Sequence, residues 1–178
     1  MRNSDLLALI RTIPDYPKQG IQFRDITTLI SDAQGFALAI DRMRDAVAPY
    51  GPTLIAGIEA RGFIFGAALA KQMGLGFVPI RKKDKLPGQT IGINYALEYG
   101  SDRIEIHAAA VGAGDQIALI DDLIATGGTA VAATRLLRST GAAVVVAAFL
   151  VDLPELGGAA ALAYENIPVE TLLTFDGH

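Results

Sequence analysis

A series of short, continuous apolar segments constrains the fold most. Residues 54–58 (LIAGI), 77–80 (FVPI), 117–120 (IALI) and 143–151 (AVVVAAFLV) show no alternation of polar and apolar side chains. Such runs are typical of strands that are covered on both faces. Segments with helical spacing of apolar residues separate them. The sequence therefore predicts an α/β fold with a doubly wound, mainly parallel sheet flanked by helices.

Further elements follow from capping residues and periodicity. Apolar side chains recur at helical spacing over residues 32–48, which predicts an amphipathic helix. The N-terminal segment reads as a short helix over residues 5–13 that ends before Pro14. The other expected elements are helices at residues 63–73 and 129–139 and strands at 103–107, which alternates like an exposed or edge strand, and at 169–175.

Composition excludes several classes of function. The chain has 178 residues, of which 51% are hydrophobic, and a net charge of −4, so it fits one domain without a global field for nucleic acid. It has no cysteine, which excludes disulfides and thiolate metal sites and fits a reducing, cytoplasmic location. The longest apolar stretch, residues 141–151, is too short to cross a bilayer.

The stretch IALIDDLIATGGTA, residues 117–130, carries the chemistry. Asp121 and Asp122 follow a buried strand, where ligands bind on parallel sheets. Gly127 and Gly128 let the backbone approach a bound group, and a helix starting at Thr129 offers free N–H groups to an anion. Two carboxylates cannot bind phosphate, but they can accept hydrogen bonds from vicinal ribose hydroxyls, with Mg²⁺ softening the repulsion. A sugar 5′-phosphate is therefore the expected ligand.

Two other nucleotide-binding folds fit the sequence poorly. An apolar strand ending in aspartates also occurs in P-loop ATPases, but those need G-x-x-x-x-G-K-[ST], which is missing here. The segment GIEARGF, residues 57–63, has the glycine spacing without the lysine. A dinucleotide G-x-G-x-x-G is missing as well, so both alternatives are weak.

The whole stretch resembles the phosphoribosyl-diphosphate-binding signature of type I phosphoribosyltransferases: an apolar strand, two acids, two apolar residues, then A-T-G-G-T. The resemblance implies that the acids Asp121 and Asp122 bind the ribose. It also implies Mg²⁺ as cofactor, held mainly by substrate and water rather than by protein ligands. The loop implied to bind the 5′-phosphate comprises Ala125, Thr126, Gly127, Gly128 and Thr129.

Further segments resemble the adenine-specific branch of this family. They are residues 16–30 (YPKQGIQFRDITTLI), 57–66 (GIEARGFIFG), 81–88 (RKKDKLPG) and 95–100 (YALEYG). Enzymes of the family that act on 6-oxopurines usually carry an aspartate where this chain has Ala125, so the resemblance favours adenine. It implies that the purine stacks on Phe23, that backbone groups around Arg24 read its edge, and that Leu153 covers its other face.

The basic run at residues 81–85 is the candidate for binding the leaving group. A charge run is usually a solvated face, but this one starts at a strand end and opens a long, weakly structured segment, where active-site lids occur. Lysines closing over a diphosphate would stabilise its departure. The residues that the resemblance implies to contact diphosphate are Arg61, Arg81, Lys82 and Lys85.

The expected reaction is transfer of a 5-phosphoribosyl group from phosphoribosyl diphosphate to adenine, giving AMP and diphosphate in purine salvage. Glu98 is the candidate for handling the purine proton and Tyr99 for closing the site; Lys82 and Arg61 complete the catalytic set. The expected organisation is one domain over residues 1–178, with residues 1–30 forming part of a purine-binding hood and residues 81–102 a flexible catalytic loop. The resemblance also implies a homodimer.

Two rival functions remain open at the level of sequence. One is an enzyme of the same fold that uses xanthine or orotate instead of adenine. The other is a non-catalytic regulator that senses the sugar phosphate, which usually needs an added DNA-binding domain or a basic face. Comparing product formation with different bases separates the first rival from the adenine enzyme.

Overall fold

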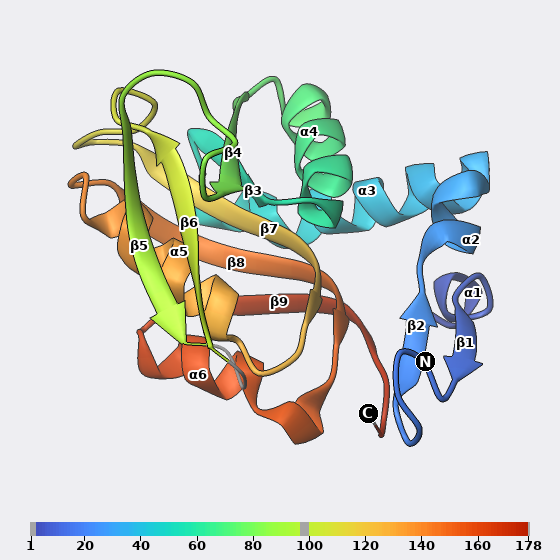
Figure 1. Cartoon of the computed structure of the whole chain (residues 1–178). Helices are drawn as coiled ribbons and strands as arrows, with labels where there is room; N and C mark the ends of the chain where they lie inside the picture. The colour runs from blue at the N-terminus through green and yellow to red at the C-terminus, as the bar shows by residue number, and fades with distance from the viewer. Residues whose placement is uncertain (1–2, 97–99, 178) are drawn as a thin grey trace.

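The computed structural model describes residues 3–96 and 100–177. A seven-stranded sheet forms its centre, and a two-stranded hairpin lies beside it (Figure 1). The strands are β1 (Arg11–Pro14), β2 (Gln22–Asp25), β3 (Leu54–Ile58), β4 (Gly76–Lys82), β5 (Thr90–Ala96), β6 (Ser101–His107), β7 (Gln116–Ile124), β8 (Ala143–Asp152) and β9 (Val169–Thr174). The helices are α1 (Ser4–Leu7), α2 (Thr27–Ser31), α3 (Ala33–Val47), α4 (Arg61–Met73), α5 (Gly128–Arg138) and α6 (Gly158–Tyr164), with 3₁₀ turns η1 (Ala48–Tyr50) and η2 (Pro154–Leu156).

The strand order in the large sheet is β5-β6-β4-β3-β7-β8-β9. The five strands from β4 to β9 pair in parallel, and β6 and β5 extend the sheet with antiparallel pairing. This arrangement confirms the predicted doubly wound, mainly parallel sheet. The carboxyl ends of β3, β4 and β7 meet at one edge, because parallel neighbours point the same way.

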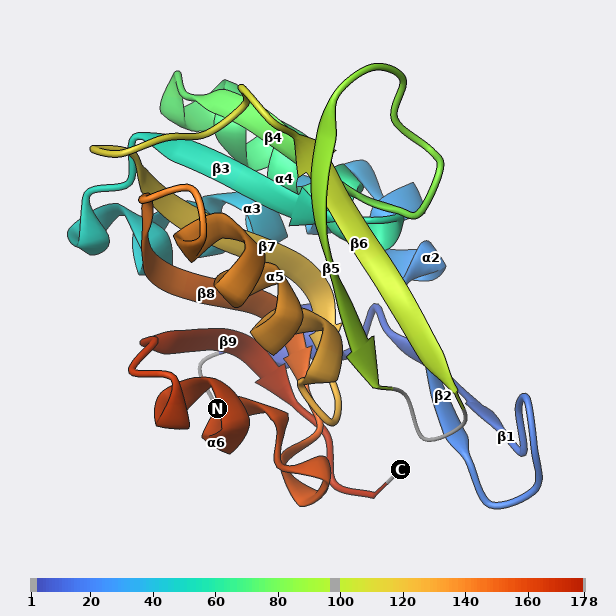
Figure 2. The same ribbon diagram turned by 60° about the vertical axis from the view of Figure 1, so that its left-hand side comes forward.

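Helices cover both faces of the sheet. Helices α3 and α4 lie on one face, and α5 and α6 on the other (Figure 2). A hydrophobic core lies on each face of the sheet, and adjacent residues of β7 point into different ones. Leu119 packs on the α5 side and Ile120 on the α4 side, and both are fully buried. No helix in the described ranges is long and apolar enough to span a membrane.

The central elements form where the sequence predicts them. Helix α3 starts after Asp32, whose Oδ1 accepts a hydrogen bond from the Gly35 N–H at 2.6 Å. Helix α4 ends at Gly74, which adopts φ +68°. That conformation is cheap only for glycine, which explains why the helix stops there.

The predicted N-terminal helix is wrong beyond its first turn. Helix α1 ends at Leu7, and β1 pairs antiparallel with β2 instead of continuing the helix. Arg11 in β1 forms an ion pair of 2.6 Å with the buried carboxylate of Asp25 in β2. The pairing of β1 with β2 outweighs the local helical pattern of residues 5–13. The sequence of residues 5–13 alone does not reveal this pairing.

The region expected to be weakly structured, residues 81–100, contains the whole of β5. This strand pairs with β6 along its length, so β5 is the sheet edge and the prediction of β6 as an edge strand is wrong. Gly92 lies within β5. A Cβ at this position would lie 2.7 Å from the carbonyl oxygen of Ile104, so the glycine permits close approach of two strand backbones.

Candidate active site

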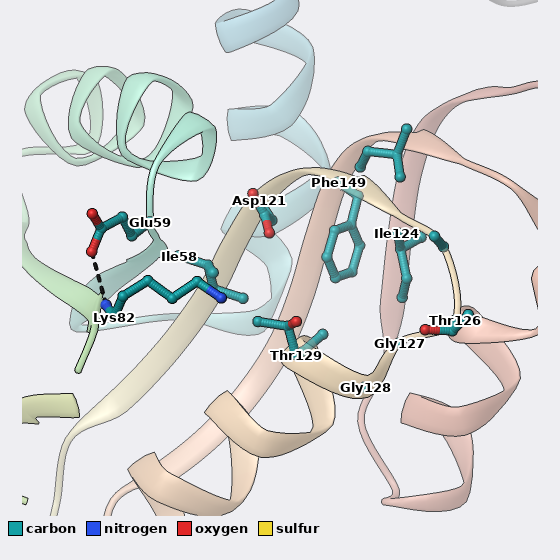
Figure 3. A pocket seen from close by; sticks show the side chains of 13 residues that line it. Ile58, Glu59, Lys82, Asp121, Ile124, Thr126, Gly127, Gly128, Thr129 and Phe149 are labelled. Carbon is teal, nitrogen blue, oxygen red and sulfur yellow. Dashed lines mark hydrogen bonds between the residues drawn. The ribbon is translucent and has the colours of Figure 1, made fainter. Parts of the chain in front are cut away.

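A cleft of about 190 Å³ lies at the carboxyl edge of the parallel strands (Figure 3). It opens between the ends of β3, β4 and β7 and the start of α5. Its lining comprises Ile58, Glu59, Lys82, Asp121, Leu123, Ile124, Ala125, Thr126, Gly127, Gly128, Thr129, Ala130 and Phe149. All five residues of the predicted phosphate loop are among them, together with Asp121 and Lys82.

The phosphate loop owes its shape to a left-handed glycine. Gly127 has φ +81° and precedes the first helical residue, Gly128, so α5 begins one residue earlier than predicted. The Gly127 carbonyl accepts the first helical hydrogen bond, from the Val131 N–H at 2.9 Å. The preceding N–H groups of this first turn have no helical partner, and with the helix dipole they favour an anion at this end of the cleft.

The two aspartates occupy different surroundings. Asp121 lines the cleft, whereas Asp122 is only 3% exposed and does not line it. The Asp122 N–H donates to Asp121 Oδ1 at 2.8 Å. Helix α4 closes over the pair so tightly that a Cβ at Gly62 would lie 2.8 Å from Asp121 Oδ1. Arg61 at the start of α4 forms an ion pair with Asp122, with Nε 3.0 Å from Oδ2.

Burial raises the pKa values of both carboxyl groups in this acidic pair. Burial raises the pKa of Asp121 well above its usual range, and the neighbouring Asp122 carboxylate raises it further. Burial also raises the pKa of Asp122, while the Arg61 guanidinium opposes that rise. The repulsion expected between two carboxylates and a nearby anion is therefore reduced, because a proton is retained more readily here than on exposed aspartates.

Glu59 was not predicted as part of the site, yet it lines the cleft. It accepts hydrogen bonds from the Lys82 backbone N–H at 2.8 Å and from the Arg81 guanidinium at 3.2 Å. The Arg81 hydrogen bonds lower its pKa. The peptide bond between Glu59 and Ala60 is cis. An acidic residue directly after a buried strand at the carboxyl edge was the available sequence signal.

Only one of the three predicted cations of the basic run lies in the cleft. Figure 3 shows the Lys82 side chain extending from β4 toward the strand that carries Asp121. Arg81 turns instead to Glu59 and to the carbonyl oxygen of Lys85, 3.3 Å away. Neither Arg81 nor Lys85 belongs to the cleft lining among the described residues.

The Lys82 ammonium is held by the β5–β6 hairpin. Its Nζ donates to the Tyr95 hydroxyl at 2.9 Å and to the carboxylate of Asp102. Burial opposes the charge on Lys82, but the hydrogen bonds to Asp102 and Tyr95 outweigh it and raise the pKa of Lys82. Tyr95 and Asp102 were not predicted, because only strand pairing brings them to Lys82.

The predicted adenine residues lie beside the cleft rather than in it. Phe23 on β2 packs edge-on against Tyr16, with ring centroids 5.2 Å apart, and the Arg61 guanidinium lies 5.9 Å from its ring. Leu153, 8% exposed, follows the carboxyl end of β8. Arg61 therefore connects the Phe23 ring to the acidic pair.

Arg24 anchors this hairpin to the C-terminal segment. Its guanidinium donates to Thr12 Oγ1 at 2.7 Å and to the Asp176 carbonyl at 2.9 Å, and it lies 4.5 Å from the centre of the Phe175 ring. The Arg24 side chain is thus engaged with the hairpin and the C-terminal segment. The two remaining predicted residues, Glu98 and Tyr99, lie outside the described residues.

Fold and cleft together define a protein that binds a phosphorylated sugar at the carboxyl edge of a doubly wound sheet. The family model of the phosphoribosyl transferase domain matches residues 27–162. An adenine phosphoribosyltransferase of Sphingopyxis alaskensis is 57% identical over 173 residues, which cover 97% of this chain and 94% of the relative. The chain therefore belongs to the phosphoribosyl transferase family and, within it, to the adenine phosphoribosyltransferases.

Solved structures agree with this assignment. The adenine phosphoribosyltransferase of Thermoanaerobacter pseudethanolicus superposes with a TM-score of 0.92 at 44% identity. The superposed region covers 97% of this chain and 99% of that protein's chain. That of Saccharomyces cerevisiae, complexed with an imino-altritol bisphosphate and adenine, superposes with a TM-score of 0.88 at 37% identity. It covers 94% of this chain and 96% of its own.

Proposed function

We propose that this chain transfers the 5-phosphoribosyl group of phosphoribosyl diphosphate to adenine, giving AMP and diphosphate for purine salvage. The observation that carries the proposal is the cleft itself. It joins an anion-binding helix start, the partly buried carboxyl group of Asp121 and a lysine in one space of a size that suits a sugar phosphate. Family membership supplies the reaction class.

The sugar phosphate fits the cleft in one direction. The N–H groups at the start of α5 and the hydroxyls of Thr126 and Thr129 donate to the 5′-phosphate oxygens. Asp121 then faces the ribose hydroxyls, and Asp122 reaches them if Arg61 moves away from it. A hydroxyl that donates to a carboxylate favours its ionised form, so ribose hydroxyls bound here lower the raised pKa values of the acidic pair.

The diphosphate belongs at the Lys82 side of the cleft. Lys82 stabilises the charge that develops on the leaving group. We propose that Arg81, Lys85 and Arg61 assist it, as predicted from the sequence. Arg81 donates to Glu59 through Nε and Nη2, so a guanidinium that swings toward the diphosphate breaks these hydrogen bonds. Closure of the turn between β4 and β5, residues 83–89, would provide the movement.

The oxygen donors at the cleft fit Mg²⁺. Asp121 and Glu59 offer carboxylate oxygens, and Asp122 Oδ2 is buried with the Arg61 guanidinium beside it but accepts no hydrogen bond. Mg²⁺ prefers such ligands but retains water and substrate oxygens, so one or two protein ligands suffice. When bound, the ion neutralises charge on the diphosphate.

Adenine approaches from the side opposite the diphosphate. Phe23 offers one stacking face, Leu153 covers the other, and backbone groups around Arg24 read the 6-amino edge. Attack at the anomeric carbon from this side inverts its configuration through an oxocarbenium-like transition state. We propose that Glu98 handles the purine proton and that Tyr99 helps to close the site.

The deciding experiment incubates the purified chain with phosphoribosyl diphosphate, Mg²⁺ and one base at a time. Adenine is expected to give AMP and diphosphate, while hypoxanthine, xanthine and orotate give turnover lower by at least about a hundredfold, because a site that reads polar edges rejects mismatched bases strongly. Turnover with orotate or a 6-oxopurine would assign the chain to another substrate. Binding of phosphoribosyl diphosphate without turnover would favour a regulator.

We also propose that residues 1–178 act as one domain in a cytoplasmic homodimer, with residues 1–30 on the purine side and residues 81–102 as the catalytic loop. Ile64 on α4 is 39% exposed, close to Arg61, and supports contact between copies through this helix. Light scattering of the purified chain measures the oligomer directly, and an Ile64→Asp variant that stays dimeric would exclude this face.

A further inference from the structure

Lys82 is not a freely moving side chain of a solvated run. Its ammonium is part of a closed network with Tyr95 and Asp102: Nζ donates to the Tyr95 hydroxyl at 2.9 Å and contacts the Asp102 carboxylate, and the Tyr95 hydroxyl lies 3.1 Å from Asp102 Oδ2. The Lys82 backbone N–H is fixed as well, by Glu59 at 2.8 Å. Both ends of the residue are therefore held.

Three adjacent strands build this network. Tyr95 of β5 and Asp102 of β6 are paired directly across the hairpin, and β6 pairs in turn with β4 at Lys82. Neighbouring side chains on paired strands lie within contact distance by construction. The position of the Lys82 ammonium is thus set by sheet register rather than by the conformation of a loop.

The donor count leaves one position open. An ammonium has three N–H donors, and Tyr95 and Asp102 use two of them. The Lys82 side chain remains 39% exposed and lines the same cleft as the phosphate loop. The remaining donor is available to an anion in that cleft.

We propose that Tyr95 and Asp102 are positioning residues that aim the Lys82 ammonium at the diphosphate of the substrate. The inference rests on the proposed function, since it assumes that Lys82 binds that group. Fixing a long side chain before the substrate arrives avoids the loss of its rotamer freedom on binding. Tyr95 acts without adding charge, and Asp102 keeps the lysine protonated.

Tyr95→Phe tests the inference most cleanly, because it removes one oxygen and no charge. We expect the KM for phosphoribosyl diphosphate to rise about fivefold to tenfold, with the KM for adenine and the melting temperature nearly unchanged. Asp102→Asn is expected to act in the same direction. Tyr164→Phe is the matched control, because Tyr164 is 89% exposed on α6 and should leave both KM values unchanged.

A double-mutant cycle with Lys82→Ala shows whether Tyr95 acts through the lysine. If it does, adding Tyr95→Phe to Lys82→Ala changes the KM for phosphoribosyl diphosphate no further. A full additional effect in the double variant, or wild-type kinetics of Tyr95→Phe, would overturn the inference while leaving the proposed function intact. An inactive wild-type protein would instead refute the proposed function.

Discussion

At the scale of single residues, the acidic pair at the end of β7 dominates the site. Asp121 is partly buried beside the buried Asp122, and both pKa values are raised, first by burial. A carboxyl group whose pKa is raised on folding retains its proton while the unfolded chain has already lost it. Its destabilising effect is therefore absent at low pH and grows as the pH rises above the unfolded value, until the folded group also ionises.

Asp121→Asn should remove this effect. We expect the free energy of unfolding of the unliganded protein at neutral pH to increase by on the order of 1 kcal/mol, because a neutral amide replaces a charge that burial disfavours. Affinity for phosphoribosyl diphosphate should fall, since a carboxylate acceptor is lost. Urea unfolding at several pH values between about 5 and 8 measures the change.

Asp45→Asn is the control for that measurement, because Asp45 is largely exposed and its ion pair with Arg44 contributes little. A stability profile of Asp121→Asn that follows the wild type at every pH would show that the carboxyl group of Asp121 carries no such penalty.

Site residues that are close together in the sequence were predicted, whereas residues brought together from distant segments were missed. Asp121 and the loop from Ala125 to Thr129 were predicted because strand, acids and glycines follow one another within one short stretch. Glu59, Tyr95 and Asp102 were missed, since each meets Lys82 only through the pairing of β3, β4, β5 and β6. A sequence motif contains only residues that are close together in the chain. It does not show which distant residues become neighbours when strands pair in a given register.

At the scale of elements, α6 supports the phosphate loop from behind. Gly158, its first residue, packs against the loop so closely that a Cβ would lie 2.3 Å from the Ala125 carbonyl oxygen and 2.9 Å from the Gly127 nitrogen. Backbone atoms cannot move aside as a flexible side chain can. The shape of the loop therefore depends on a glycine about thirty residues further along the chain.

Gly158→Ala is expected to displace the loop. The KM for phosphoribosyl diphosphate should rise by about tenfold or more, and stability should fall by about 1–3 kcal/mol from overpacking. Gly157→Ala is the matched control: Gly157 has φ +75° but nothing within 4 Å of its Cβ position. It should lose about 1 kcal/mol of stability through backbone strain while keeping its KM. Equal KM values in the two variants would mean that α6 does not shape the loop.

Elements buried on both faces were the predictable ones. The apolar runs of β3 and β8 can only be covered strands, and their helices follow from capping and periodicity. The hairpins β1–β2 and β5–β6 were misread because their pairing partners determine them. Gly92 looks like a break in sequence, yet in the sheet it lies against the Ile104 carbonyl. Local propensity is a weak guide where the partner strand decides.

At the scale of the whole molecule, hairpin β1–β2 contacts the segment that follows β9. The hairpin carries Phe23, the proposed adenine-stacking residue, and Arg24 ties it to Phe175 and to the carbonyl of Asp176. The sugar-phosphate cleft depends instead on β4, β7 and α5. In the proposed function the two substrates therefore bind to parts of the molecule that are held largely by separate contacts, with Arg61 between Phe23 and Asp122 as the link.

Arg24→Met tests this separation, since it keeps the apolar stem and removes the contacts with Thr12 and Asp176. We expect the KM for adenine to rise about threefold to tenfold with that for phosphoribosyl diphosphate unchanged, because only the hairpin loses its anchor. Hydrogen exchange should accelerate in β2 and stay slow in β7.

Arg138→Met on α5 serves as control, with both KM values retained. A parallel rise of the two KM values in Arg24→Met would mean that the hairpin and the cleft respond as one unit.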